Sequence, residues 1–362
     1  MTQISAKIVA DSISPQGHRI TSMLLTYPRI IHAEMCRHRM HSRNSSSSRA
    51  IPFEKMIEKV ENDPFIPVAW QKDHKGMQGN EYITEDETFQ SMNPENPFNK
   101  LEAAIGVWKQ AASLAISQAK YLNHSTKCGV TKQLCNRLLE PFTWHQELIT
   151  ATEWENFFEL RCPQYSPCHA TYPYRSRKDA IKDYGKSHSY LKEWTDKDWL
   201  QYSYSGAEIH IQLLAEKMWD AMNESNPQQL DEGEWHIPFG DQIDESFIKD
   251  LSKRMVSTSL DLKIKIAVAR AARLSYATHD GEINYEKDIE LHDRLLKMKH
   301  MSPTEHVARA MNENEYQMYV QGKKEPFMDD NAPVDMYTDS EDMQGWCKNF
   351  HGWIPYREMV EL

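Results

Sequence analysis

Residues 37 to 49 read RHRMHSRNSSSSR and form the part of the chain best suited to bind an anion. Four arginines, two histidines, an asparagine and five serines fall within these thirteen positions. Guanidinium groups form charge-assisted hydrogen bonds with phosphate, and hydroxyl and backbone N–H groups add further donors. Apolar Ile30-Ile31 before the segment and Ile51-Pro52-Phe53 after it favour a folded site, while composition alone leaves a solvated arginine-serine linker open.

A second set of arginines lies in GVTKQLCNRLLEPF and ATEWENFFELR. Arg137 stands four residues before Pro141, and Asn156 stands five residues before Arg161. Taken separately, each arginine fits a helix surface equally well, because long cationic side chains cover apolar helix faces and keep their heads in water.

The order Arg37-His38-Arg39, seven further residues, Ser47 and then Arg49 resembles the signature of flavin-dependent thymidylate synthases. Both spacings around Arg137 and Arg161 resemble that family as well. The resemblance implies that the first part of the segment contacts the flavin and that its end holds the nucleotide phosphate. The flavin contacts it implies are Arg37, His38, Arg39, Asn44 and Asn156; the phosphate contacts are Ser47, Ser48 and Arg49; the pyrimidine contacts are Arg137 and Arg161.

Two more segments resemble the family, in an unexpected order. AEIHIQLLAEKMW, residues 207–219, is similar to the helix that follows the second arginine. ARAARLSYATHDGE and HMSPTEH are similar to segments that precede the Arg-His-Arg signature in the family, whereas here they lie far C-terminal to it. The resemblance places His300, Ser302 and Glu305 in the flavin site. We therefore expect a circularly permuted fold, which is physically reasonable because chain termini often lie close together at a surface.

The resemblance implies methylation of dUMP at C5 to dTMP, with FAD, NADPH and 5,10-methylenetetrahydrofolate. Flavin supplies redox chemistry that side chains lack, and the protein supplies positioning and electrostatics. Arg137 and Arg161 are the expected catalytic residues, and Arg137 would stabilise negative charge that develops on the pyrimidine. No enzymic cysteine attacks the base in this chemistry, and no cysteine here has a local setting that marks a nucleophile.

Several positions depart from the family pattern. Glu34 stands where a substrate-site Gln is common, Ser45 follows Asn44 where a Glu is usual, and Thr152 replaces a flavin-contacting Arg. An acidic Glu34 beside a phosphate is unfavourable unless it is paired, so we expect it to face an arginine. These changes leave open which pyrimidine base the enzyme would use. Methylation or hydroxymethylation of dUMP or dCMP to a modified DNA precursor is the nearest alternative.

Two further alternatives belong to other classes. A non-enzymatic nucleotide- or RNA-binding protein could use the arginine-serine segment, but a net charge of −11 opposes broad binding to nucleic acid. A metal enzyme could use His32, Glu34, His38 and His41, but no HExxH motif or zinc-type cysteine spacing occurs. We expect neither a metal, nor nucleic acid, nor a membrane as a partner.

The bulk properties are those of an ordinary globular chain. Hydrophobic residues make up 40% and charged residues 26% of 362 residues. No apolar run approaches a membrane span, and the N-terminus lacks a charged-then-apolar signal. We expect a cytoplasmic protein with reduced, partly buried cysteines, and a homotetramer, since the family builds each active site between subunits.

The elements that position these residues combine strands and helices. Residues 5–12 and 18–27 predict strands around the turn Pro15-Gln16-Gly17. Apolar residues spaced by three and four predict helices over Leu101–Leu122 and 211–222. A helical region over Thr131–Leu160, broken at Pro141, is also expected, with further helices at 245–276 and 287–299 and a loop-rich stretch at 312–345.

The predicted fold class is α/β (α+β). We expect a thymidylate synthase-complementing-protein-like flavin fold, helix-rich, with a small mixed sheet. A single catalytic domain would span residues 1–362, with insertions at about 62–100 and 163–205.

Overall fold

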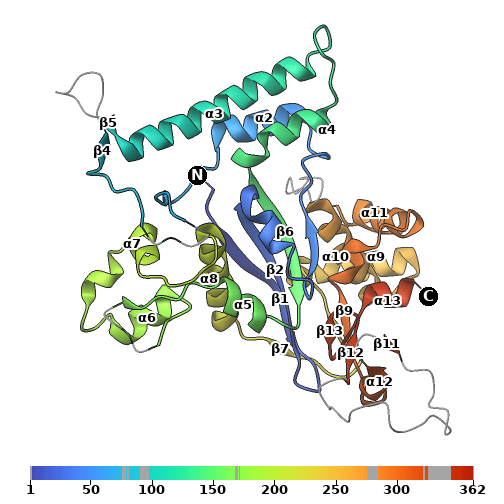
Figure 1. Ribbon diagram of the computed structural model, residues 1–362. Coiled ribbons are helices and arrows are strands. Elements are labelled where there is room, and N and C mark those ends of the chain that lie inside the picture. Colours follow the sequence, from blue (N-terminus) through green and yellow to red (C-terminus); the bar gives the residue numbers. More distant parts are fainter. Residues whose placement is uncertain are drawn as a thin grey trace, which may run out of the picture.

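A five-stranded sheet occupies the centre of the molecule (Figure 1). The computed structural model describes residues 2–75, 79, 81–89, 98–167, 170, 172–274, 284–320, 323–324 and 344–361. The strand order is β3-β6-β2-β1-β7, and all neighbours are antiparallel except β1 and β7. The strands are β1 (Ser5–Ile13), β2 (Arg19–Pro28), β3 (Ser42–Ser45), β6 (Trp144–Ala151) and β7 (Gln228–Gln229).

The predicted N-terminal hairpin is confirmed. β1 pairs with β2 from Ser5 opposite Thr26 to Ile13 opposite Arg19, with one irregularity near Val9. The turn needs Gly17, whose φ of +87° is a left-handed conformation that side chains with a Cβ rarely adopt. The hairpin sets the sheet on which the arginine-serine segment lies.

The helix predicted over Thr131–Leu160 is wrong in its middle. The structure has a short helix α4 (Lys132–Cys135), a 3-10 helix η2 (Asn136–Phe142), the strand β6, and then α5 (Glu155–Arg161). β6 pairs with β2 on one side and β3 on the other, so this stretch is a central strand. Its aromatic and β-branched residues suit a strand, and pairing on both edges outweighs weak helical propensity.

Helices cover both faces of the sheet. The predicted helix around residues 211–222 is confirmed as α8 (Ile209–Glu224), which packs with α5 against β1 and β2. On the other face, α10 (Ser259–Leu274) brings Ala271 and Leu274 against Leu148 of β6. The sheet is therefore the middle layer of an α+β architecture (Figure 1).

The long helix predicted over Leu101–Leu122 is confirmed as α3 (Lys100–Asn123). One side of it packs against α2 (Phe53–Asn62) and η2, through Ala112, Ala119 and their neighbours. It lies along one end of the molecule (Figure 1). Its outer side leaves three large apolar residues exposed at seven-residue intervals: Val107, Leu114 and Tyr121.

Further elements surround this centre. Two helices, α9 and α10, fill the stretch predicted as helical at 245–276, and α11 confirms the helix predicted at 287–299. The loop-rich stretch expected at 312–345 lies mostly outside the described residues. The remaining elements are η1 (Arg29–Ile31), α1 (His32–Met35), β4 (Thr88–Phe89), β5 (Phe98–Asn99), α6 (Arg177–Tyr184), η4 (Ser189–Lys192), α7 (Asp196–Gln201), β8 (Trp235–His236), η5 (Gly240–Gln242), α9 (Glu245–Met255), α11 (Tyr285–Lys297), η6 (Ser302–Glu305), β9 (Ala308–Ala310), α12 (Glu313–Met318), β10 (Tyr319–Val320), β11 (Lys323–Lys324), β12 (Trp346–Cys347), β13 (Phe350–His351), β14 (Trp353–Pro355) and α13 (Tyr356–Val360).

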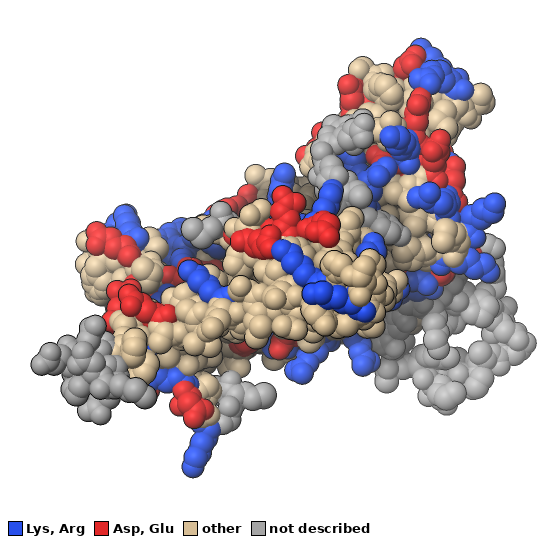
Figure 2. All heavy atoms as spheres, turned by 90° about the horizontal axis from the view of Figure 1, so that it is seen from above, with Lys and Arg blue, Asp and Glu red and all other residues tan. Residues whose placement is uncertain are grey.

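Basic and acidic side chains are interspersed on the face seen in Figure 2, and neither sign covers the whole of it. None of the helices in the described part of the chain combines the length and apolar character needed to cross a bilayer. Of the cysteines that the structure describes, Cys135, Cys162 and Cys347 are buried free thiols, whereas Cys36 and Cys128 are exposed free thiols.

Candidate functional site

Three elements from the segments singled out in the sequence, η2, α5 and η6, contact residues 37–49 around β3, although they lie far apart along the chain. The Nε atom of Arg161 donates to Nε2 of His38 at 3.0 Å. The Ser302 hydroxyl donates to the backbone carbonyl of Arg43 at 3.1 Å, which joins η6 to β3. Asn136 donates from Nδ2 to the carbonyl of Ser48 at 2.8 Å and so joins η2 to the end of the serine run.

Arg43 shapes the arginine-serine segment from within. Its guanidinium donates to the carbonyls of Met35 and His38 and, at 3.1 Å, to that of Cys36. These carbonyls end the short helix α1 and the turn after it, and a helix end without donors is unfavourable. Arg43 is therefore a structural residue that folds the loop back on itself, and the segment is not a solvated linker.

His38 and His41 lie on an aromatic cluster under the loop. Their rings are stacked with centroids 5.8 Å apart, and both contact the Phe157 ring of α5. Burial, followed by nearby positive charge, lowers the pKa of His38 to about 4 and that of His41 to about 3. His38 is thus neutral at pH 7, which allows its Nε2 to accept the hydrogen bond from Arg161.

Arg161 experiences opposing charges. Burial and then the charge of Arg37 lower its pKa, while the carboxylate of Glu34 raises it. Glu34 therefore faces an arginine electrostatically, as expected from the sequence. Its Oε2 atom is buried and has no hydrogen-bond partner within the described residues. A buried carboxylate oxygen without a donor is costly, so a hydrogen-bond donor from a ligand would stabilise Glu34.

Four arginines predicted to bind ligand lie at the surface. Arg37, Arg39, Arg49 and Arg137 are exposed, and in the described part of the chain none of them forms an ion pair with a carboxylate. They are unlike Arg175, which pairs with Glu155 and with Glu159. Exposed guanidinium groups without an ion pair can each donate to an anionic ligand.

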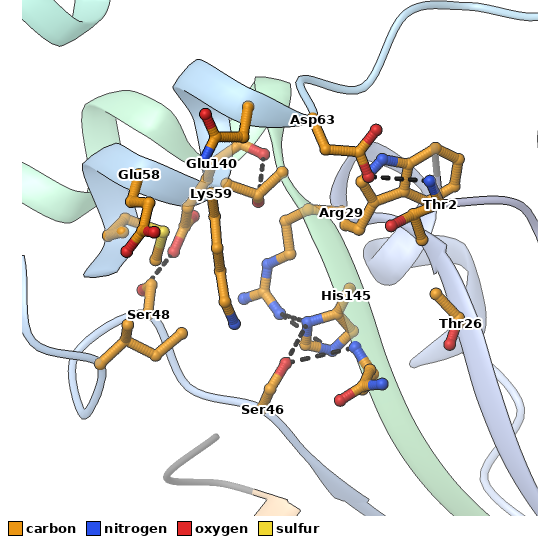
Figure 3. A pocket seen from close by; sticks show the side chains of 16 residues that line it. Thr2, Thr26, Arg29, Ser46, Ser48, Glu58, Lys59, Asp63, Glu140 and His145 are labelled. Carbon is orange, nitrogen blue, oxygen red and sulfur yellow. Dashed lines mark hydrogen bonds between the residues drawn. The ribbon is translucent and has the colours of Figure 1, made fainter. Parts of the chain in front are cut away.

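Other predicted residues make contacts within the protein. Asn44 is buried and donates to the backbone carbonyl of Ala271 in α10, and Glu305 forms an ion pair with Arg357. Ser48, which was predicted to bind the nucleotide phosphate, donates to the Glu140 carboxylate at 2.5 Å (Figure 3). This contact places a negative charge beside Ser48. Among the other predicted site residues, Ser47 is half-buried, and Asn156 and His300 are exposed.

The donor set fits an anionic dinucleotide such as FAD better than it fits a metal. The exposed arginines offer paired N–H donors for a diphosphate, and Nδ1 of His41 is a buried ring nitrogen without a partner in the described residues. No group of three or more His, Cys, Asp or Glu side chains in the described ranges could hold a metal ion. His32, Glu34, His38 and His41 do not come together as such a group in the described ranges.

Sequence reasoning missed a polar group behind the site. The Tyr27 phenol donates to Glu147 at 2.7 Å and lies 2.9 Å from Nδ1 of His32. Glu147 is 1% exposed, and burial raises the pKa of its carboxyl. Neighbouring His145 contacts Arg29. The sequence signal for this group was the pair of polar residues His145 and Glu147 in β6. The helix predicted over this stretch did not place them beside Tyr27.

Comparison with known proteins gives little further information. No protein-family model matches the chain, and no curated protein matches it. Two crystal structures of the UMP/dUMP methylase PolB from Streptomyces cacaoi are similar in part. The form bound with 5-Br UMP has a TM-score of 0.38 at 15% identity and covers 62% of this chain and 91% of its own. The form bound with 5-Br dUMP has a TM-score of 0.33 at 13% identity and covers 52% and 92%. Both TM-scores are below 0.5, so this similarity assigns neither an activity nor a substrate to the chain.

Proposed function

We propose that this protein is a flavin-dependent enzyme that methylates dUMP at C5 to give dTMP, with 5,10-methylenetetrahydrofolate as the carbon donor and NADPH as the reductant. One observation carries the proposal. Segments that resemble the flavin-dependent thymidylate synthases occur in a permuted order, yet η2, α5 and η6 all meet the loop around β3. Chance matches scattered over a chain of this length have no reason to meet at one place.

In this proposal FAD lies against Arg37, His38 and Arg39, with Asn156, His300, Ser302 and Glu305 nearby, and supplies the redox chemistry when bound. Ser47 and Arg49 bind the nucleotide phosphate by charge-assisted hydrogen bonds. These contacts orient the base and lower the entropic cost of reaction.

Arg137 and Arg161 act on the pyrimidine. Negative charge develops on the ring as C5 becomes nucleophilic, and a positioned guanidinium stabilises that charge. The bond to neutral His38 uses only Nε of Arg161, so His38 does not engage the two terminal nitrogens of the guanidinium. His38 is therefore a positioning residue for Arg161.

A second substrate, dCMP, is favoured by one observation. The unpartnered Oε2 atom of Glu34 can only accept a hydrogen bond when ionised. The exocyclic amino group of cytosine donates, whereas uracil O4 accepts. If Glu34 reaches this edge of the base, methylation or hydroxymethylation of dCMP follows. The homotetramer also remains a proposal, and light scattering of the purified protein tests it.

A product assay tests the proposed function. The protein is incubated with FAD, NADPH, methylenetetrahydrofolate and either dUMP or dCMP, and products are identified by mass. We expect dTMP from dUMP, and loss of at least about 100-fold in rate for Arg161→Gln, since one electrostatic donor contributes about that much. Arg254→Gln, an exposed arginine on α9, is the matched control. No product from either base contradicts the enzyme proposal and leaves a non-enzymatic nucleotide-binding protein.

Glu34→Gln separates the two bases. Replacing a pure acceptor by an amide that also donates favours uracil O4 over the cytosine amino group. If dCMP is the substrate, the variant loses activity on dCMP and gains relative activity on dUMP. An unchanged ratio shows that Glu34 does not read the base.

A further inference from the structure

A hairpin near the C-terminal end of the chain lies against the arginine-serine segment. It consists of β12, β13 and the turn between them, residues 346–351. The amide nitrogen of Asn349 in this turn donates to the backbone carbonyl of Met40 at 3.2 Å and to the Ser42 hydroxyl at 3.0 Å. Met40 lies in the turn that follows residues 37–39, and Ser42 begins β3. The hairpin therefore contacts the chain between the proposed flavin contacts and the sheet.

Asn349 and Arg43 hold the same loop at different points. Arg43 donates to three backbone carbonyls between residues 35 and 38, and Asn349 donates to that of Met40. Loop carbonyls need donors as much as those in helices do, and here side chains supply them. Loss of the Asn349 amide should therefore loosen the turn at Met40 and leave the Arg43 contacts in place.

The geometry of the hairpin directs Asn349 towards this loop. Lys348, the first residue of its two-residue turn, has a φ of +58°, a left-handed conformation that residues other than glycine rarely adopt. Tight hairpin turns use this conformation, usually with Asn or Gly. On the other side of Asn349 the Phe350 ring is fully buried, and Lys348 pairs with Glu358 of α13 at 3.0 Å. These contacts fix the turn that presents Asn349.

The hairpin also reaches a position where the sequence departs from the family pattern. The backbone N–H of His351 donates to Oγ1 of Thr152 at 3.1 Å. Thr152 stands where the resemblance implies a flavin-contacting arginine, and a guanidinium could not accept this hydrogen bond. The His351 ring stacks on that of His18, with centroids 3.6 Å apart. The hairpin is thus tied to the approach to α5 as well as to the loop before β3.

We propose that Asn349 is a positioning residue of the flavin site, because it fixes the turn next to residues 37–39. The inference rests on the proposed function, in which those residues contact FAD. A loop that is already held in one conformation has a lower ordering cost when it binds a ligand. Asn349 therefore raises the affinity for FAD without touching it. The helix α13 adds a second link, since Arg357 pairs with Glu305, another proposed flavin contact.

Two measurements on the full chain test the proposal. Hydrogen exchange followed by mass spectrometry, without FAD, reports how firmly the backbone of residues 36–42 is held, and quenching of flavin fluorescence measures the affinity for FAD. In Asn349→Ala we expect about tenfold faster exchange of residues 36–42 and about tenfold weaker FAD binding, because two hydrogen bonds to the loop are lost. Thr152→Val removes the acceptor for the His351 N–H and should change both quantities in the same direction. It keeps the test valid if Asn349→Ala fails to fold.

Asn123→Ala is the matched control. Nδ2 of Asn123 donates to the backbone carbonyl of Val130 at 3.0 Å, at the far end of α3, so this variant loses a bond of the same kind away from the site. It should lower the stability in urea and keep wild-type exchange of residues 36–42 and wild-type FAD affinity.

Unchanged exchange of residues 36–42 in Asn349→Ala overturns the proposal, and so does faster exchange with wild-type FAD affinity. The second result would leave Asn349 with a purely structural role. If the wild-type chain binds no FAD, the proposed function fails, whereas the exchange of residues 36–42 still decides whether the hairpin holds the turn. The failure of one proposal can therefore be told from the failure of the other.

Discussion

Nε of Arg161 donates to Nε2 of His38 across 3.0 Å, although 123 positions separate the two residues. The bond joins the end of α5 to the loop before β3. It depends on a neutral imidazole, because a protonated His38 would donate rather than accept and would repel the guanidinium. The proposed site is therefore assembled by a contact that acid should break.

Arg161→Gln should reduce affinity for dUMP by about 10- to 100-fold and lower the free energy of unfolding by about 1 kcal/mol. The substitution removes the hydrogen bond to His38 and the positive charge that faces the Glu34 carboxylate. Calorimetric titration with dUMP and chemical denaturation measure the two quantities. Wild-type affinity in the variant would show that Arg161 does not contact the nucleotide.

Acid should destabilise the protein before its carboxylates titrate. Burial lowers the pKa of His236 and of His306 from 6.5 to about 3. In the unfolded chain these residues take up protons near pH 6.5, so the unfolded state binds more protons and stability falls as pH drops. Each histidine should cost about 2 kcal/mol of unfolding free energy between pH 7.5 and pH 5.

Denaturation with urea at several pH values measures this effect. His306→Gln should flatten the dependence between pH 7.5 and pH 5, because the variant lacks one of the protons taken up on unfolding. The exposed His124 is the control, and His124→Gln should leave the slope as it is in wild type. A stability that stays flat down to pH 5 in wild type contradicts the neutral, buried state of these rings.

His236 and His306 should share one tautomer, because a chain of hydroxyls connects them. Ser12 lies 3.0 Å from Nδ1 of His236, and Ser22 lies 2.9 Å from its Nε2. Ser22 and Thr150 are 2.6 Å apart, and Thr150 is 2.9 Å from Nδ1 of His306. Each contact needs one proton, so all donors point along the chain in the same sense.

Both rings then carry their proton on Nε2, or both carry it on Nδ1. Nitrogen NMR of protein labelled at histidine distinguishes the two tautomers at pH 7.5. In Thr150→Val the chain is cut, and His306 is expected to populate both forms. Opposite tautomers in the wild-type protein would rule out a continuous chain of hydrogen bonds.

Glu147→Gln should stabilise the protein more at pH 8 than at pH 5. Burial raises the pKa of Glu147 above 4.5, so its protonated form stabilises the fold at low pH and that contribution is lost as pH rises. The amide avoids the buried charge, and we expect a gain of about 1 kcal/mol at pH 8. The exposed Glu54 provides a control. A loss of stability at pH 8 would show that the charge is needed.

The elements with a clear repeat could be predicted from the sequence. α3 has apolar residues every three to four positions, and the hairpin has β-branched residues around Gly17. β6 could not be predicted, since a central strand buried on both faces loses the alternation that marks a strand. Its partners β2 and β3 decide its conformation, and such pairing is not visible in the local sequence.

The candidate site was predictable in part. Composition and order predicted Arg49 and Arg161 as anion-binding residues, and the structure brings Arg161 to His38 of the arginine-serine segment. Anion binding by either residue stays a prediction. The pocket lined by Arg29, Lys59 and His145 (Figure 3) was not predicted, because these residues come from η1, α2 and β6 with no motif between them. The role of Asn44 as a link to α10 also depends on tertiary packing that a linear pattern does not contain.

The visible absorbance spectrum of the protein mixed with FAD, recorded before and after addition of dUMP, tests the central claim most directly. We expect bound flavin bands that shift with dUMP, and loss of the shift in Arg161→Gln. Free-flavin bands that do not change with protein, dUMP or dCMP would contradict the site around β3.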